Sequence, residues 1–271
     1  MSERAIGIFD SGIGGLTVMR ALAARLPNEC FIYLGDTARL PYGTKSGDTV
    51  TRYALQAATA LSKRDVKTLV VACNTASAVA LPALEKMFAP TPVIGVIGPG
   101  AEAAVTAAPD GPIAIIATEG TVKGGAYVRA IEAHGRSVPV IQQACPLFVS
   151  IAEEGLVDGE IAEAIARRYL APVLAAVPRP KALVLGCTHF PALKDTIAKI
   201  AGGDIKLVDS AETTAKAVEA TLIAKNLRRK ESEKPVHTFL ATDAPDRFAR
   251  VGEIFLGQPI DPGQVELVDL Q

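Results

Sequence analysis

The chain contains no tryptophan, and aromatic residues make up only 5% of its 271 residues. It also has little net charge, because 28 Lys and Arg face 29 Asp and Glu, for a formal charge of −1. A near-neutral chain gives no electrostatic reason to expect nucleic acid or an anionic membrane as a partner. No run of about 18 apolar residues occurs, so no transmembrane helix is expected. Arg4 leads directly into the apolar Ile6–Phe9 segment, which predicts a cytoplasmic protein without a signal peptide.

Cysteine and histidine are scarce as well, with four and three residues respectively. The cysteines are Cys30, Cys73, Cys145 and Cys187, and no two of them have a CxxC-type spacing. This pattern argues against a structural zinc site, and a reducing compartment argues against a disulfide framework. Most isolated cysteines are small buried hydrophobic residues, and this is what we expect of Cys30 and Cys145.

The sequence alternates short apolar runs with helical periodicity throughout its length. Strands that are apolar on both faces and alternate with helices are typical of parallel sheets flanked by helices. The apolar runs predict strands over residues 5–9, 30–34, 67–73, 92–96, 113–117, 137–141, 181–185, 205–209, 236–240 and 265–268. The periodicity predicts helices over residues 16–26, 48–63, 157–176, 213–228 and 246–255, and one that starts near residue 74 and is interrupted at Pro82.

Two segments recur in the same order in both halves of the chain. Leu69–Cys73 and Leu183–Cys187 share one layout at an offset of 114 residues, and Ile6–Ser11 and Ile113–Thr118 share another at an offset of 107. Changes in loop length would absorb the difference between the two offsets. The repetition therefore predicts a pseudo-two-fold duplication of α/β domains, with a boundary near Ile97–Gly100.

The region after Asp209 is too short to form a domain of its own and is expected to pack on the first half. The predicted first domain is then discontinuous, with residues 1–97 and 208–271, and the second domain has residues 98–207. The charged run at residues 228–234 is expected to be a solvated connector. A ligand site is expected in the cleft between the domains.

Cys73 and Cys187 stand at the ends of the two equivalent strands, where open parallel sheets bind ligands. Each thiol precedes two polar residues, Asn74–Thr75 and Thr188–His189, that can cap a helix and bind a ligand. A thiol at a helix N-terminus is expected to have a lowered pKa. We therefore favour a functional role over a buried apolar one for this pair.

The segment Asp10–Gly15 is a glycine-rich loop between a predicted strand and a predicted helix. It matches neither G-x-G-x-x-G nor G-x-x-x-x-G-K-[ST], so it gives weak support for nucleotide binding. Its glycines are expected to leave backbone N–H groups free for a carboxylate, and an ionised Asp10 suits an ammonium group or a proton transfer. The alternative is that Asp10 and Ser11 merely cap the helix.

Two further features have competing interpretations. The polar loop at Gly35–Gly43 contains Pro41, Tyr42 and Gly43, which can present backbone amides and a phenol to a ligand or form an ordinary surface turn. A single histidine is usually structural, and it can also bind a metal or transfer protons. The position of His189, two residues after Cys187, favours a chemical role.

Two thiols on opposite faces of one small molecule can invert a stereocentre. A thiolate on one face removes a proton from carbon, and a thiol on the other face returns one. Each sulfur should then lie about 3–3.5 Å from the reacting carbon. The two sulfurs would then lie about twice that distance from each other, which is well beyond the S–S distance of roughly 2.05 Å in a disulfide.

These residues resemble the glutamate racemases of the aspartate/glutamate racemase superfamily. Six ordered segments carry the resemblance: IGIFDSGIGGLTV (6–18), YLGDTARLPYGTKS (33–46), VACNTASAVALPAL (71–84), PVIGVIGPG (92–100), CPLFVSIAEEG (145–155) and LVLGCTHFPAL (183–193). The resemblance implies an isomerase without pyridoxal phosphate or any other cofactor, and without a metal. It implies a cytoplasmic homodimer that interconverts L- and D-glutamate for peptidoglycan synthesis, and hence for cell-wall biogenesis and cell shape.

The resemblance also implies roles for individual residues. Cys73 would deprotonate the D-isomer and Cys187 the L-isomer, while Asp10, Glu153 and His189 would assist the thiols. Asp36 would stand behind the substrate-contacting residues. The implied substrate-binding residues are Asp10, Ser11, Pro41, Tyr42, Gly43, Asn74, Thr75, Thr118, Thr188 and His189.

Without an electron sink, such a site must stabilise a carbanion electrostatically in a closed, dry cleft. Backbone N–H groups are the expected donors, and closure is expected about the link near Gly98–Gly100. Three other functions remain open. They are a sister racemase or isomerase acting on aspartate or maleate, a binding protein with inert thiols, and a redox dithiol.

Overall fold

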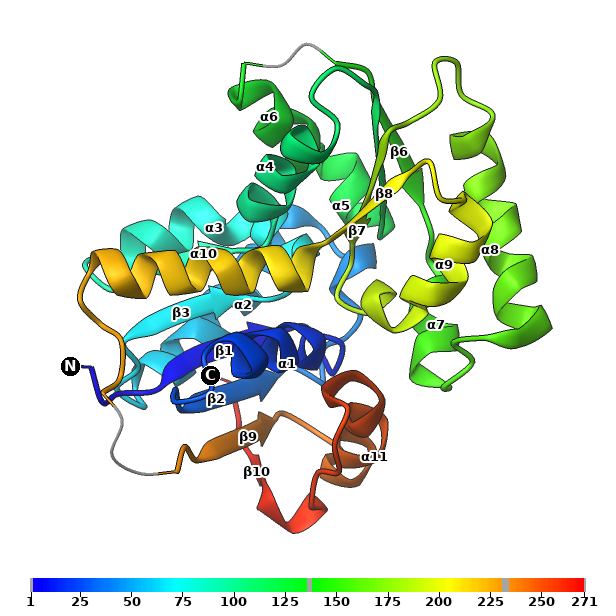
Figure 1. Cartoon of the computed structure of the whole chain (residues 1–271). Helices are drawn as coiled ribbons and strands as arrows, with labels where there is room; N and C mark the ends of the chain where they lie inside the picture. Colours follow the sequence, from blue (N-terminus) through cyan, green and yellow to red (C-terminus); the bar gives the residue numbers. More distant parts are fainter. Residues whose placement is uncertain (1, 136–137, 231–233, 271) are drawn as a thin grey trace.

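A computed structural model describes residues 2–135, 138–230 and 234–270, and it contains two sheets, each flanked by helices (Figure 1). The strands are β1 (Ile6–Asp10), β2 (Phe31–Gly35), β3 (Thr68–Val71), β4 (Val93–Gly95), β5 (Ile113–Ala117), β6 (Val140–Ala144), β7 (Ala182–Gly186), β8 (Lys206–Asp209), β9 (His237–Ala241) and β10 (Val265–Leu267).

The longer helices are α1 (Leu16–Arg25), α2 (Gly47–Ser62), α3 (Asn74–Phe88), α4 (Ile97–Ala107), α8 (Gly159–Leu174), α10 (Ser210–Ala224) and α11 (Pro245–Leu256). The shorter helices are α5 (Glu119–Gly124), α6 (Ala126–Ala133), α7 (Leu147–Glu153) and α9 (Lys194–Ala201), and three-residue or four-residue 3₁₀ turns lie at Tyr42–Thr44, Phe190–Leu193 and Pro262–Gln264.

The two sheets repeat one topology. The first has the order β10-β9-β2-β1-β3-β4 and the second has the order β6-β5-β7-β8, with parallel pairing between neighbours. The four consecutive strands β2-β1-β3-β4 thus match β6-β5-β7-β8 one for one. The predicted fold of two related α/β units is confirmed. Because β3 and β7 are equivalent, the thiols that follow them occupy equivalent positions.

The central strands are buried on both faces, as helix-covered parallel strands require. All residues of β1, β5 and β7 are buried. The C-terminal segment completes the first sheet, because β9 pairs with β2 and β10 pairs with β9. The predicted boundary at residues 207–208 lies within β8, which pairs with β7 as far as Asp209. We therefore propose that the second domain extends through Asp209.

The structure differs from the expected elements in three places. Strand β6 begins at Val140 instead of residue 137, because Pro139 has no N–H to donate and only its carbonyl joins the ladder. The short helices α5, α6, α7 and α9 were not predicted, since each is too short for a clear periodicity. The expected link at Ile97–Gly100 forms the first turn of α4, where a proline is well tolerated.

Parts of two predicted elements, Ser137 and residues 231–233 of the charged connector, lie outside the described residues. Within the ranges that are described, no helix is long and apolar enough to cross a membrane.

Candidate active site

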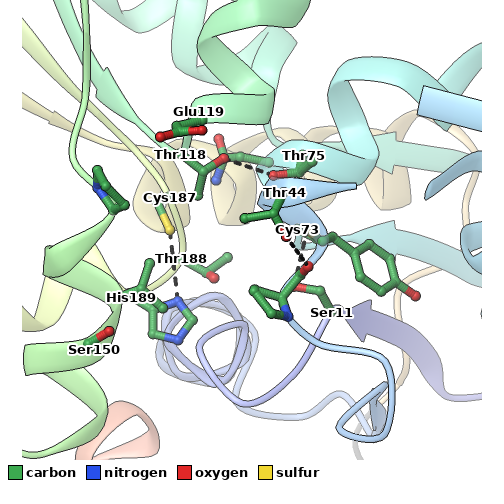
Figure 2. A pocket seen from close by; sticks show the side chains of 16 residues that line it. Ser11, Thr44, Cys73, Thr75, Thr118, Glu119, Ser150, Cys187, Thr188 and His189 are labelled. Atoms are coloured by element: carbon green, nitrogen blue, oxygen red, sulfur yellow. Dashed lines mark hydrogen bonds between the residues drawn. The ribbon is translucent and has the colours of Figure 1, made fainter. Parts of the chain in front are cut away.

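A cavity of about 270 Å³ lies where the carboxyl ends of strands from both sheets face each other (Figure 2). This volume is close to the lower end of the range for small-molecule sites, about 300–1,000 Å³. The lining residues follow β1, β2, β3, β5, β6 and β7: Ser11, Pro41, Tyr42, Gly43, Thr44, Cys73, Asn74, Thr75, Thr118, Glu119, Pro146, Val149, Ser150, Cys187, Thr188 and His189. Figure 2 shows Cys73 beside Ser11 on one wall and Cys187 beside His189 on the other.

Cys73 caps helix α3, with its Sγ 3.4 Å from the backbone N of Ala76. The same sulfur lies 3.5 Å from Ser11 Oγ. Burial and the nearby carboxylate of Asp10 raise the pKa of Cys73 to about 12, against the hydrogen bonds of Ser11 and Ala76. The expected lowering of the pKa by the helix N-terminus is therefore wrong for Cys73. Burial outweighs the helix dipole, and Cys73 is a thiol at neutral pH.

Asp10 lies behind this wall and does not line the cavity. It is fully buried, and its Oδ2 accepts a 3.0 Å hydrogen bond from Gly12 N. Burial raises the pKa of Asp10, opposed by the charge of His189 and by the N–H groups of Gly15, Gly12 and Ser11. The amides of the glycine-rich loop therefore serve the carboxylate of Asp10. We had expected them to face a ligand.

The glycines of that loop allow two close approaches. A Cβ at Gly14 would lie 2.5 Å from ring atoms of His189. A Cβ at Gly15 would lie 2.5 Å from Asp10 Cβ and 2.8 Å from Tyr33 Oη. The glycine pattern here provides space for the side chains of His189, Asp10 and Tyr33.

Cys187 belongs to a chain of polar contacts. Its Sγ lies 3.8 Å from His189 Nδ1, and His189 Nε2 lies 2.9 Å from Glu153 Oε1. Arg247 Nη2 donates a 2.8 Å hydrogen bond to Glu153 Oε2. The four groups are thus arranged in the order Cys187, His189, Glu153, Arg247.

The charges in this series of polar contacts favour the protonated form of His189. Burial alone would lower the pKa of His189, but the hydrogen bonds and charges of Cys187 and Glu153 raise it to about 10. Burial would raise the pKa of Glu153, but His189 and Arg247 lower it to about 2. The imidazole of His189 thus lies next to Cys187 Sγ, whereas the hydroxyl of Ser11 lies next to Cys73 Sγ. The two cysteines therefore differ in environment.

The loop after β2 is held by the buried Asp36. Its carboxylate accepts hydrogen bonds from the Tyr42 hydroxyl, from Arg39 Nε and, at 3.0 Å, from Thr242 Oγ1. Burial and Asp36 raise the pKa of Tyr42. The Tyr42 hydroxyl, one of the groups that could have faced a ligand, bonds Asp36 instead, although Tyr42 lines the cavity.

Neutral donors gather on the wall formed by α3, α5 and α6. The hydroxyls of Thr75, Thr118 and Thr121 lie 3.0–3.3 Å from one another. Tyr127 Oη donates a 2.8 Å hydrogen bond to Asn74 Oδ1. The buried Asn74 Nδ2 has no hydrogen-bond partner in the described part of the chain, so it is a donor available to a ligand.

Most of the candidate residues from the sequence line this one cavity. Those that do are Ser11, Pro41, Tyr42, Gly43, Cys73, Asn74, Thr75, Thr118, Cys187, Thr188 and His189, whereas Asp10 and Glu153 stand behind it. Of the cysteines expected to be ordinary, Cys145 is buried and Cys30 is only half-buried. Among the described residues, no group of three or more His, Cys, Asp or Glu is placed to hold a metal ion.

Sequence reasoning missed several residues around the site. Thr44, Glu119, Pro146, Val149 and Ser150 line the cavity, and two of them, Thr44 and Glu119, directly follow predicted site residues in the sequence. Tyr127 and Arg247 stand behind Asn74 and Glu153. No motif marks these two positions, because their roles arise only from the packing of α6 and α11 against distant segments.

The fold and the site define a two-unit α/β protein with a thiol from each unit at one shared cavity. The sequence pattern of the Asp/Glu/Hydantoin racemase family matches residues 7–218, and the chain belongs to this family. It is 50% identical over its full length to a glutamate racemase of Geobacter metallireducens, of which it covers 98%.

Solved structures of glutamate racemases are similar to this chain over nearly its full length. The glutamate racemase of Francisella tularensis in complex with D-glutamate superposes with a TM-score of 0.91 at 39% identity, covering 100% of this chain and 99% of that one. The glutamate racemase of Thermus thermophilus in complex with β-chloro-D-alanine gives a TM-score of 0.89 at 41% identity, covering 99% and 98%.

Proposed function

We propose that this chain is a glutamate racemase that interconverts L- and D-glutamate by a two-base mechanism without pyridoxal phosphate. The observation that carries the proposal is the placement of Cys73 and Cys187 on facing walls of one cavity, at equivalent strand ends. The names of the relatives at full-length coverage supply the substrate.

The neighbours of the two thiols suggest how a turnover begins. We assign Cys187, whose Sγ lies 3.8 Å from His189 Nδ1, as the base that removes the α-proton of L-glutamate. Cys73, a thiol by its raised pKa, donates its proton to the opposite face of the carbanion. The product is D-glutamate, with Cys187 now a thiol and Cys73 a thiolate. The reverse reaction starts from that second state, which fits the family roles of the two thiols.

Mostly uncharged groups contact the substrate in this proposal. Among the described residues, the cavity lining contains no Lys or Arg, although glutamate carries two carboxylates. The neutral donors are the hydroxyls of Ser11, Thr75, Thr118 and Thr188 and the unpaired amide nitrogen of Asn74. These fixed dipoles, together with the imidazolium of His189 in the same lining, stabilise negative charge that develops at the α-carboxylate.

The biological setting belongs to the same proposal. Glutamate racemases supply D-glutamate for peptidoglycan, so we propose this role, a cytoplasmic location and a homodimer. Relatives with glutamate racemase names support the metabolic role.

A circular-dichroism assay with purified protein, no added cofactor, and L-glutamate or L-aspartate tests the activity. Loss of signal with L-glutamate alone is expected, and exclusive turnover of L-aspartate would point to the sister activity. Cys73→Ser and Cys187→Ser should each lower kcat by about 10²–10⁴-fold, the usual contribution of a general acid or base. Cys30→Ser, outside the cavity, is the matched control. Normal turnover by a folded Cys73→Ser protein would contradict the two-base mechanism.

A further inference from the structure

Helix α11 contacts the Cys187 side of the site at two points, although it belongs to the C-terminal segment that completes the first sheet (Figure 1). Arg247, in the first turn of α11, bonds Glu153 at the end of α7. Phe255, near the other end of α11, packs edge-on against the ring of His189, with centroids 5.0 Å apart at 78°. One helix therefore contacts the imidazole directly and also holds its partner Glu153.

Glu153 divides its two oxygens between two cations. Oε1 faces His189 Nε2 at 2.9 Å, and Oε2 accepts from Arg247 Nη2 at 2.8 Å. A carboxylate held at only one oxygen can rotate about its terminal torsion, whereas one held at both cannot. The contact with Arg247 thus fixes the direction in which Glu153 presents Oε1 to His189.

We propose that Arg247 is a positioning residue for the proton transfer at Cys187, acting through Glu153 and His189. Arg247 does not line the cavity and touches neither thiol. It acts by holding the Glu153 carboxylate, which in turn holds the imidazolium of His189 with its Nδ1 toward Cys187. This proposal rests on the proposed racemase function.

The contact also joins the two halves of the protein. Arg247 comes from the segment that completes the first sheet, and Glu153 comes from the helix that follows β6 of the second sheet. The Arg247 side chain is 40% exposed and that of Glu153 is 13% exposed, so solvent screens the pair in part, and without Arg247 the Glu153 carboxylate still faces His189 Nε2. Its removal is therefore expected to change the proton transfer far more than the folding.

The test uses Arg247→Met, the conservative Arg247→Lys, and Arg250→Met as a control at an exposed position of the same helix. We expect Arg247→Met to lower kcat for L-glutamate about tenfold, the effect of losing one charge-assisted hydrogen bond, with KM within about twofold. Arg247→Lys should recover most of the loss, and Arg250→Met should match the wild type.

Two readouts separate positioning from a general structural effect. Iodoacetamide labelling at neutral pH, followed by mass spectrometry of each peptide, should show slower labelling of Cys187 in Arg247→Met and unchanged labelling of Cys73. In a Glu153→Gln background, Arg247→Met should cause no additional loss of kcat, because its effect passes through Glu153.

A wild-type kcat in folded Arg247→Met would overturn the proposal, as would a full additional loss in the Glu153→Gln background. Equal slowing of labelling at both cysteines would also overturn it, since that indicates a general disturbance. If the wild-type protein turns over no glutamate, the proposed function fails. The labelling readout, which needs no turnover, then still decides whether Arg247 controls the environment of Cys187.

Discussion

Tyr127 Oη donates a 2.8 Å hydrogen bond to Asn74 Oδ1, and this bond connects helix α6 of the second unit to the start of α3 in the first. Both side chains are buried. Because the Asn74 oxygen is occupied by Tyr127, the amide nitrogen is the atom of this cavity-lining residue that has no partner among the described residues. Tyr127 thus determines which end of the Asn74 amide remains unpaired.

Tyr127→Phe removes this bond while keeping the ring. Loss of one neutral hydrogen bond costs about 0.5–1.5 kcal/mol, so KM for glutamate should rise about two- to tenfold as the amide becomes free to rotate. The labelling rate of Cys187 by iodoacetamide should not change. Steady-state kinetics measures the effect, with Tyr53→Phe as a control. A wild-type KM would show that Tyr127 does not orient Asn74.

The pair of His189 and Glu153 should give stability a pH dependence of known sign. The pKa of His189 is raised from 6.5 to about 10, so its contribution is complete below pH 6.5 and is lost as pH rises through 10. The pKa of Glu153 is lowered from 4.5 to about 2, so its contribution is complete above pH 4.5 and is lost as pH falls through 2. The pair therefore stabilises the fold most between pH 4.5 and 6.5.

It follows that His189→Gln should lower Tm more at pH 6 than at pH 10. Thermal unfolding of both proteins at the two pH values measures this difference. Both proteins contain the other groups that titrate over this range, so the difference between their Tm values removes the contribution of those groups. An equal loss of Tm at both values would contradict the raised pKa of His189.

Lys67 and Glu29 form an ion pair whose side chains are 1% and 3% exposed. The pair lies near the amino ends of the first sheet's strands, opposite to the cavity. Lys67→Met leaves a buried unpaired carboxylate and should lower the free energy of unfolding by about 3–5 kcal/mol. Adding Glu29→Gln should recover most of the loss. Urea unfolding measures both, and no recovery in the double variant would show that the charge is not the cause.

The sequence predicted the alternating elements and the equivalence of Cys73 and Cys187, because buried parallel strands and their polar ends leave a local pattern. It did not predict the short helices α5 and α7, which are defined by packing instead of periodicity. It also gave the wrong direction for the pKa of Cys73. The helix start is visible in the sequence, but the burial and the charge of Asp10 that outweigh it arise only in the folded structure.

The residues behind the site also show how far prediction from the sequence reaches. Asp10 and His189 were singled out by their positions in the sequence and Glu153 by the family resemblance, whereas Arg247 and Tyr127 follow no local pattern. Arg247 meets Glu153 across 94 residues of sequence, and Tyr127 meets Asn74 across 53. Contacts of this range depend on how the two sheets face each other, which no short motif encodes.

Two alanine substitutions in the glycine-rich loop can show whether the loop acts by leaving room for neighbouring side chains or through its backbone N–H groups. A Cβ at Gly12 would have only ordinary contacts, the nearest at 3.5 Å to Leu40, whereas a Cβ at Gly14 would lie 2.5 Å from the His189 ring and 2.8 Å from Thr188 Oγ1. Neither glycine has a positive φ, so alanine strains neither backbone.

Gly14→Ala should therefore push His189 away from Cys187 and lower kcat by about tenfold or more, as displacement of a proton-transfer partner does. Gly12→Ala keeps the N–H that binds Asp10 and should retain a kcat within about threefold of the wild type. Steady-state kinetics and the labelling rate of Cys187 measure both variants. If both substitutions inactivate equally while the proteins remain folded, the loop acts through its backbone, and the account of Gly14 as the space for His189 fails.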